Sequence, residues 1–138
     1  MRKAAAVGIL GLALLTGATG CAAPGLVCPA IGWINTLEVD ASAFAGDVFV
    51  QLCVEAGCSS APGETPSMSS DLAIPVSTGD GVYEIGMTTP DEATVRVYDA
   101  AGALIQESEH VINWTLPTDP CGGPGTADPI ILTSDAVQ

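Results

Sequence analysis

Segment 47–55 constrains the fold most, because its side chains alternate with a period of two. Every second residue from Val48 to Val54 is Val or Leu, so these apolar side chains share one face. Gln51, Cys53 and Glu55 fall on the other face. This alternation is typical of a half-buried β-strand and differs from a helical pattern, which repeats every ~3.6 residues.

Seven further short runs have strand character, and turn residues separate them. The runs cover 33–39, 71–77, 82–88, 93–99, 103–107, 110–116 and 129–133. Gly79-Asp80-Gly81 tolerates positive φ angles and predicts a hairpin between the strands on either side, and Asp99-Ala100-Ala101-Gly102 predicts a second. Short strands punctuated in this way predict an all-β fold, a single antiparallel β-sandwich of about seven or eight strands. Its predicted core comprises Val48, Val50, Leu52, Ile74, Val76, Ile85, Val95, Val97, Ile112 and Trp114.

The first 21 residues have the layout of an exported lipoprotein. Arg2 and Lys3 precede an apolar run over 4–15, and small residues then lead to Cys21. This is the layout of a secretory signal, and the run is too short to span a bilayer comfortably. Ala18-Thr19-Gly20-Cys21 resembles the lipobox of bacterial lipoproteins, which implies that Cys21 is diacylated and becomes the N-terminus. Ordinary cleavage near this point and a retained transmembrane anchor are the alternatives.

Acylation of Cys21 would set both the domain organisation and the localisation. Two or three acyl chains hold a protein firmly at a membrane, whereas one chain holds it only marginally. We therefore expect a protein anchored by lipid at the extracytoplasmic face of the cell membrane. Its parts would be a signal peptide (1–20), a lipidated N-terminus with a short tether (21–30) and the β-sandwich domain (31–138).

The other four cysteines predict two disulfides, because an even number in an exported chain indicates a disulfide framework. Of the three possible connectivities we favour Cys53 with Cys58, which flank a strand end and a turn, and Cys28 with Cys121. The second pair would tie the start of the mature domain to the loop before its last strand. A four-cysteine zinc site is the alternative, but structural zinc sites usually take their ligands from closely spaced pairs. We predict no metal and no cofactor.

Removal of residues 1–20 would leave a strongly acidic chain. The full sequence has 16 acids and three bases, a formal charge of −13. Without Arg2 and Lys3, only Arg96 opposes the 16 acids, and the formal charge becomes −15. This chain lacks the basic stripe of a nucleic-acid-binding protein and would be repelled by anionic headgroups. We predict no nucleic-acid partner, and an unidentified cationic, extracellular or envelope partner instead.

Segment 93–102, with the sequence ATVRVYDAAG, resembles the strand, turn and returning strand of immunoglobulin-like and carboxypeptidase-regulatory-like (prealbumin-like) sandwich domains. With Cys53-x4-Cys58 and the loop Cys121-Gly122-Gly123-Pro124, the chain is similar to small lipoproteins of high-GC Gram-positive bacteria. The resemblance implies a fold and a cellular location, and it implies no catalytic residues.

The sequence contains little that supports catalysis. His110 is the only histidine, and we expect a solvent-facing strand residue, since no Gly-x-Ser-x-Gly motif is present to supply a nucleophile. Glycosidases use two carboxylates, one held protonated and one ionised, but in so acidic a chain an adjacent pair such as Asp91-Glu92 arises by composition alone. We therefore predict that the protein is not an enzyme.

Binding at the loops is the alternative function. Calcium takes oxygen ligands from carboxylates and loop carbonyls, and five acids lie in or near predicted loops: Asp80, Glu84, Asp91, Asp119 and Asp128. Trp33 and Trp114 could stack on sugar rings, although their apolar alternation favours a packing role. Asn113-Trp114-Thr115 matches a glycosylation sequon, which we interpret as accidental. The leading hypothesis is a non-enzymatic binding or structural module of the cell envelope, and the alternative is a small calcium- or glycan-binding module.

Overall fold

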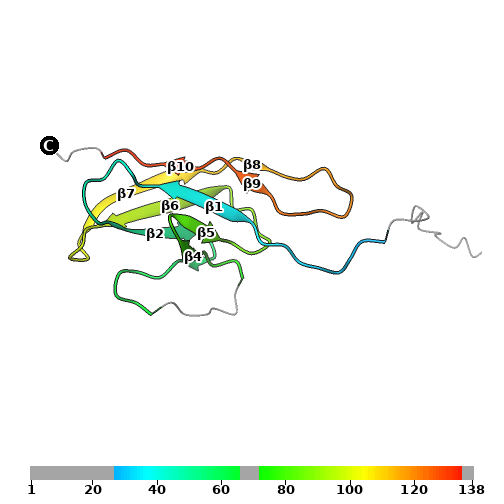
Figure 1. Ribbon diagram of the computed structural model, residues 1–138, viewed down its shortest axis with the longest axis horizontal. Coiled ribbons are helices and arrows are strands. Elements are labelled where there is room, and N and C mark those ends of the chain that lie inside the picture. The colour runs from blue at the N-terminus through cyan, green and yellow to red at the C-terminus, as the bar shows by residue number, and fades with distance from the viewer. Residues whose placement is uncertain (1–26, 66–71, 135–138) are drawn as a thin grey trace, which may run out of the picture.

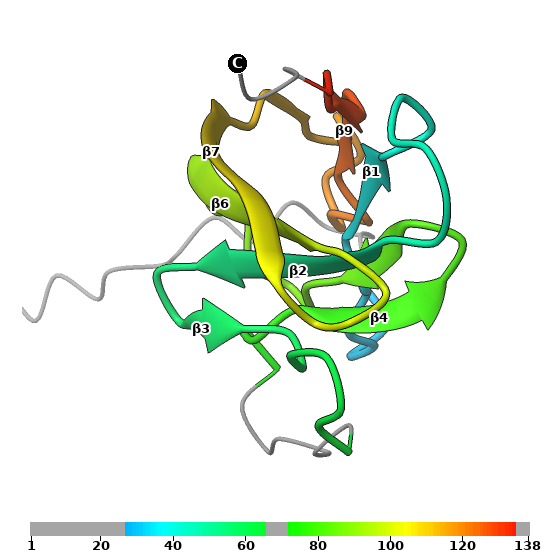
Figure 2. The same ribbon diagram turned by 90° about the vertical axis from the view of Figure 1, so that its left-hand side faces the viewer.

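The computed structural model describes residues 27–65 and 72–134, and this part of the chain forms ten short strands and no helix (Figure 1). The all-β prediction is confirmed. The strands form two sheets. One has the order β4 (Val76–Gly79), β5 (Val82–Glu84), β1 (Thr36–Asp40), β9 (Thr126–Ala127) and β8 (Trp114–Thr115), with β10 (Ile130–Ile131) also paired with β1. The other has the order β3 (Gly57–Cys58), β2 (Phe49–Val54), β6 (Glu92–Tyr98) and β7 (Leu104–Val111) (Figure 2).

Pairing around β1 departs from the antiparallel prediction. β1 pairs antiparallel with β5, but it pairs parallel with β9 at Thr36 and with β10 at Val39 and Asp40. The sheet is mixed because the chain returns from β8 and lays two short strands along the same edge of β1. Two-residue strands such as β3 and β9 are too short to show a periodicity, which explains why the sequence analysis did not find them.

Both predicted hairpins are present. In the β4–β5 turn, Asp80 and Gly81 have φ angles of 51° and 78°, and Gly81 is required because an added Cβ would lie 2.4 Å from the carbonyl oxygen of Val39. In the β6–β7 turn, the Asp99 carboxylate accepts hydrogen bonds from the amides of Ala101 and Ala103, both at 2.9 Å.

Strand β7 corrects the predicted break between 103–107 and 110–116. It runs without interruption from Leu104 to Val111 along β6. It ends where the amide of Ile112 donates instead to the carbonyl of Asp91, at 2.8 Å. The sequence pattern concealed this strand because its inward-facing positions are polar residues rather than apolar ones.

The two sheets share one hydrophobic core. Leu37, Val39 and Tyr83 come from the first sheet and Ile85 directly follows β5, while Leu52, Val95 and Val97 come from the second sheet. Tyr83 also joins the sheets, because its hydroxyl donates to the carbonyl of Val50 at 2.7 Å. Ile112, Ile130, Leu132 and Ala93 complete the cluster.

The predicted core is correct at its centre and wrong at one edge. Five of its residues are buried: Leu52, Ile85, Val95, Val97 and Ile112. Val48, Val50 and Trp114 are half-buried against the cluster, and Ile74 is half-buried. Val76 is exposed, because β4 is an edge strand whose register places Val76 opposite Glu84 on the outer face.

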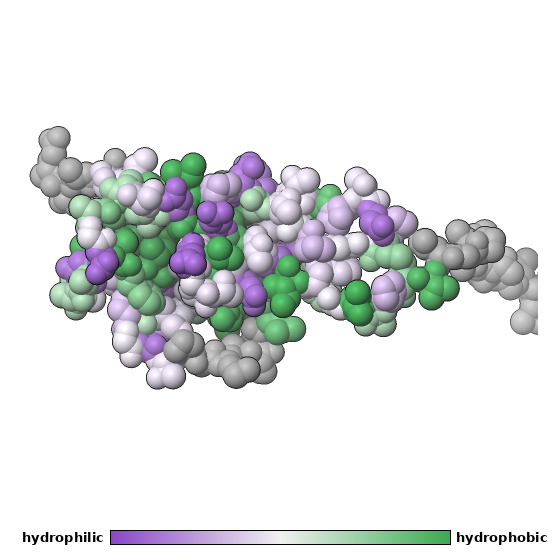
Figure 3. Space-filling model, in the orientation of Figure 1, coloured by the Kyte–Doolittle hydropathy of each residue, from purple (hydrophilic) through white to green (hydrophobic). Residues whose placement is uncertain are grey.

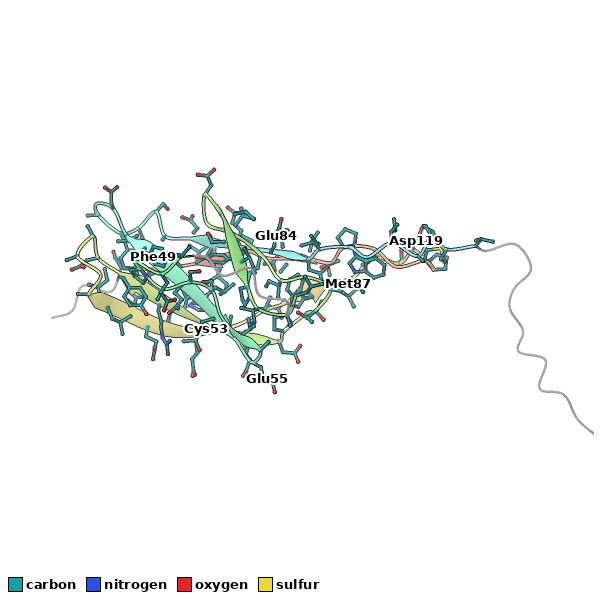
Figure 4. The ribbon with its side chains drawn as sticks, turned by 90° about the horizontal axis from the view of Figure 1, so that it is seen from below. Phe49, Cys53, Glu55, Glu84, Met87 and Asp119 are labelled. Atoms are coloured by element: carbon teal, nitrogen blue, oxygen red, sulfur yellow. A yellow bond between two sulfur atoms is a disulfide. The ribbon has the colours of Figure 1, made fainter. Side chains whose placement is uncertain are left out.

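A finger projects from this two-sheet body. We define the finger as residues 27–35 and 116–125, two segments that run side by side and are joined by a disulfide (Figures 1 and 4). Asn35 holds its base, because the buried amide donates to the carbonyl of Thr88 at 2.9 Å and accepts from the amide of Gly125 at 2.7 Å. Figure 4 places Met87 where the finger meets the body and Asp119 towards its outer end.

Candidate functional site

Two disulfides join the cysteines that the sequence analysis paired. Cys53 and Cys58 lie directly opposite each other in β2 and β3, with their Cα atoms 3.9 Å apart. Cys28 and Cys121 are bonded across the finger, with their Cα atoms 5.2 Å apart. All four sulfurs are thereby in disulfide bonds, which leaves none of them as a thiolate for zinc. Cys21, the predicted lipidation site, lies outside the described residues.

A hollow of about 780 Å³ lies at one end of the four-stranded sheet. Four carboxylates line it. Glu92 begins β6, Glu109 lies in β7, Asp91 precedes β6 and Glu55 follows β2. The register sets Glu109 beside Thr94, which is in turn beside Cys53, so these side chains share the outer face of the sheet. The hollow therefore presents a concentration of negative charge around a disulfide.

Arg96, the only lysine or arginine among the described residues, lies further along the same face and is already paired. Arg96 forms an ion pair with Glu107, its cross-strand neighbour, and both side chains are well exposed. The hydrogen bond that Arg96 donates to the Glu107 carboxylate, together with the negative charge of that carboxylate, raises the pKa of Arg96 further above its ordinary value. Next to it, Tyr98 donates to the side-chain oxygen of Gln51 at 3.0 Å, and Gln51 donates to the carbonyl of Ser59 at 2.8 Å. No lysine or arginine among the described residues is left to neutralise the carboxylates of the hollow, which His110 also lines.

His110 occupies a different environment from the one expected. It is half-buried rather than freely exposed, and its Nε2 lies 2.8 Å from the hydroxyl of Ser108. Residues two apart in a strand point to the same face, so β7 brings the hydroxyl and the imidazole together. Acyl transfer would need a third group that orients the imidazole, and donors for an oxyanion. Within the described ranges no such group contacts His110, and the pair is best explained as a hydrogen bond that satisfies two polar side chains facing inward.

The five acids proposed as calcium ligands do not converge. Asp80 lies in the β4–β5 turn, Glu84 in β5, Asp128 between β9 and β10, and Asp119 in the finger, while only Asp91 reaches the hollow. Asp119 serves the local turn, because its carboxylate accepts from the amide of Cys121 at 2.8 Å. Among residues 27–65 and 72–134, no group of three or more histidine, cysteine and acidic side chains is placed to hold a metal ion.

Both tryptophans pack, as their alternation suggested. Trp33 lies against Gly122, where an added Cβ would be 2.5 Å from the indole. Trp114 donates from its indole nitrogen to the carbonyl of Pro90 at 2.9 Å and packs against the core. Asn113 of the sequon is exposed just before β8.

Buried Asn35, which bridges the finger and the body, is a residue that the sequence analysis missed. Nothing in the local pattern marks an asparagine as buried, since its two partners lie 53 and 90 residues away in the chain. The sequence places Gly122 in a loop, and its contact with Trp33 likewise depends on the fold.

Comparison with models of protein families, with curated proteins and with solved structures finds no match. Nor do the described residues contain a helix that is long and apolar enough to cross a membrane.

Proposed function

We propose that the protein is a non-enzymatic binding or structural module of the cell envelope, anchored through an acylated Cys21 at the extracytoplasmic face of the membrane. The body would be a β-sandwich of the immunoglobulin-like or prealbumin-like kind. Its partner would be cationic and would bind the acidic face of the four-stranded sheet.

The distribution of charge is the observation that carries this proposal. Fourteen of the 16 acids lie in the described residues, against Arg96 alone, and that base is paired with Glu107. Four of the acids line one hollow of about 780 Å³. Complementary potentials steer partners together and reject partners of like charge. The face therefore favours a cationic protein segment and disfavours nucleic acid.

The disulfides support the extracytoplasmic address. Structural disulfides persist in oxidising compartments and are rare in the cytosol. Metabolic labelling with a palmitate analogue tests the anchor directly, because the wild type should be labelled and a Cys21→Ala variant should not. An unlabelled wild type would refute acylation.

A cationic probe tests the binding face. We expect a short peptide that alternates lysine and glycine to bind at low salt and to be released at high salt, as measured by calorimetry and by shifts of backbone amide resonances. A variant that removes three of the four carboxylates of the hollow (Glu55→Gln, Glu92→Gln, Glu109→Gln) should bind several-fold more weakly.

A matched variant on the other sheet (Glu38→Gln, Asp80→Asn, Glu84→Gln) removes the same number of charges and is the control. Equal weakening in both variants would show that the peptide responds to net charge alone and that the hollow is not the site. The calcium alternative remains a prediction. A melting temperature that rises with millimolar calcium would favour it over the protein-binding role.

A further inference from the structure

The finger differs from the body in charge. Segment 27–35 contains no charged residue, and segment 116–125 contains only Asp119. The described residues outside the finger contain thirteen acids and Arg96. The charged residues of the body therefore lie apart from the nearly uncharged finger, because the finger projects from the body (Figure 1).

The finger also exposes aliphatic side chains. Val27 is 90% exposed, Ile31 68% and Leu116 60%. Trp33, Leu116 and Met87 line one hollow of about 280 Å³ where the finger meets the body, and Figure 3 shows hydrophobic residues along the finger and at this junction. Clustered apolar side chains on an exported protein indicate a surface that contacts another apolar phase or partner.

The finger is braced by its own contacts. The disulfide between Cys28 and Cys121 ties its two segments together. Trp33 packs on Gly122, and Asn35 hydrogen-bonds both segment 116–125 and the body. A surface held in this way can be presented to a partner without a large loss of conformational entropy on contact.

The position of the proposed acylated Cys21 indicates that the exposed apolar side chains of the finger would contact the membrane. The described chain begins at the outer end of the finger, at Val27, six residues after Cys21. Six residues span at most about 20 Å when fully extended. A chain acylated at Cys21 would therefore keep the outer end of the finger within that distance of the bilayer surface.

We infer that the exposed apolar side chains of the outer part of the finger, with Val27 and Ile31 foremost, rest in the interfacial region of the outer leaflet and orient the acidic body away from it. This inference rests on the proposed acylation of Cys21. Neutral apolar surface is favoured at this depth, whereas the carboxylates of the body are repelled by anionic headgroups. Asp119 is the one carboxylate that the finger would bring near the headgroups.

Tryptophan fluorescence tests the contact, because the chain has two tryptophans and Trp33 lies in the finger. The acylated chain, isolated from the producing cells, is reconstituted in phosphatidylcholine vesicles with or without bromine on the upper acyl carbons. We expect brominated lipid to quench a Trp114→Phe variant, in which Trp33 alone reports, at least about twofold. If that variant does not fold, the wild type minus a Trp33→Phe variant gives the same quantity.

Matched variants separate the finger from the body. Ile31→Ser should reduce the quenching about twofold. Ile131→Ser should leave it unchanged, because Ile131 is as exposed as Ile31, at 67%, but lies on the body. Equal effects of the two changes would overturn the inference.

Two further outcomes distinguish this inference from the proposed function. A chain that carries the palmitate label and floats with the vesicles, but whose Trp33 is not quenched, overturns the contact and leaves the anchor intact. An unlabelled chain refutes the anchor itself. A concentration-dependent dimer of the Cys21→Ala chain that Ile31→Ser abolishes would assign the apolar surface to a second copy and overturn the membrane contact.

Discussion

Replacement of Tyr83 by phenylalanine should change the dependence of stability on pH as well as stability itself. Tyr83 is 2% exposed, and its hydroxyl donates to the carbonyl of Val50 in the opposite sheet at 2.7 Å. Loss of a neutral hydrogen bond of this kind costs about 1 kcal/mol. We therefore expect Tyr83→Phe to unfold about 1 kcal/mol more easily than the wild type near pH 8.

The stability advantage of the wild type over Tyr83→Phe should disappear at alkaline pH. Burial raises the pKa of Tyr83 from 10.0 to about 12. Between these values the unfolded state loses the proton while the folded state keeps it, so stability that is present below pH 10 is lost as the pH rises. Near pH 11 the wild type should have lost about 1.4 kcal/mol through this group. Tyr83→Phe cannot undergo this loss and should match or slightly exceed the wild type there.

Urea unfolding followed by tryptophan fluorescence, with the disulfides intact, measures both quantities. The background is low, because the only lysine of the sequence is Lys3 and the only other tyrosine is Tyr98. Tyr98→Phe is the control, since it keeps Tyr83 and should retain the alkaline loss due to that residue. A difference between the wild type and Tyr83→Phe that is the same near pH 8 and near pH 11 would refute the reasoning.

The finger provides three further predictions. Replacing both Cys28 and Cys121 by serine should lower the free energy of unfolding by roughly 4–5 kcal/mol on the chain-entropy model, because the bond spans 93 residues; urea unfolding that is unchanged would contradict this. Gly122→Ala should destabilise by at least about 1 kcal/mol more than Gly46→Ala, since both positions have φ near 80° but only Gly122 has a tryptophan ring against it; equal melting temperatures would count against the contact. Asn35→Ala should cost about 2 kcal/mol and speed hydrogen exchange at the base of the finger, because it leaves two backbone groups without their partners; unchanged exchange there would be inconsistent with the bridge.

The sequence predicts the parts of the fold that depend on neighbouring residues. Alternation over 47–55 identifies β2, and the glycines around Asp80 identify the β4–β5 hairpin, because each is a local consequence of strand pleating and turn geometry. The parallel pairing of β1 with β9 and β10 could not be predicted in this way. It joins residues about 90 apart through bridges of one or two residues, which are too short to produce a pattern.

Features of the candidate site that depend on neighbouring residues could likewise be predicted, whereas those that depend on the fold could not. The cysteine pairing could be predicted, since four cysteines allow few connectivities and two of them flank a turn. The convergence of Glu55, Glu92 and Glu109 could not, because β2, β6 and β7 become neighbours only in the folded sheet. The inward orientation of Ser108 and His110 could not be predicted either, since polar residues in a strand suggest a solvent-exposed face.

The predicted lipid anchor would bring a strongly acidic chain close to a membrane whose anionic headgroups repel it. The separation of the acidic body from the nearly uncharged finger would reduce this repulsion. A body with thirteen carboxylates and one guanidinium is repelled by an anionic leaflet over a Debye length, about 8 Å at physiological ionic strength. An anchor attached directly to such a body would hold it within the region where the repulsion is strongest. Nine residues from Val27 to Asn35 can span up to about 30 Å, which is the upper limit of the distance that the finger adds between anchor and body. In the proposed arrangement, this disulfide-braced finger, whose only charged residue is Asp119, would let apolar contact act at the membrane. It would also hold the acidic face of the four-stranded sheet away from the headgroups, where that face could bind a cation-rich partner.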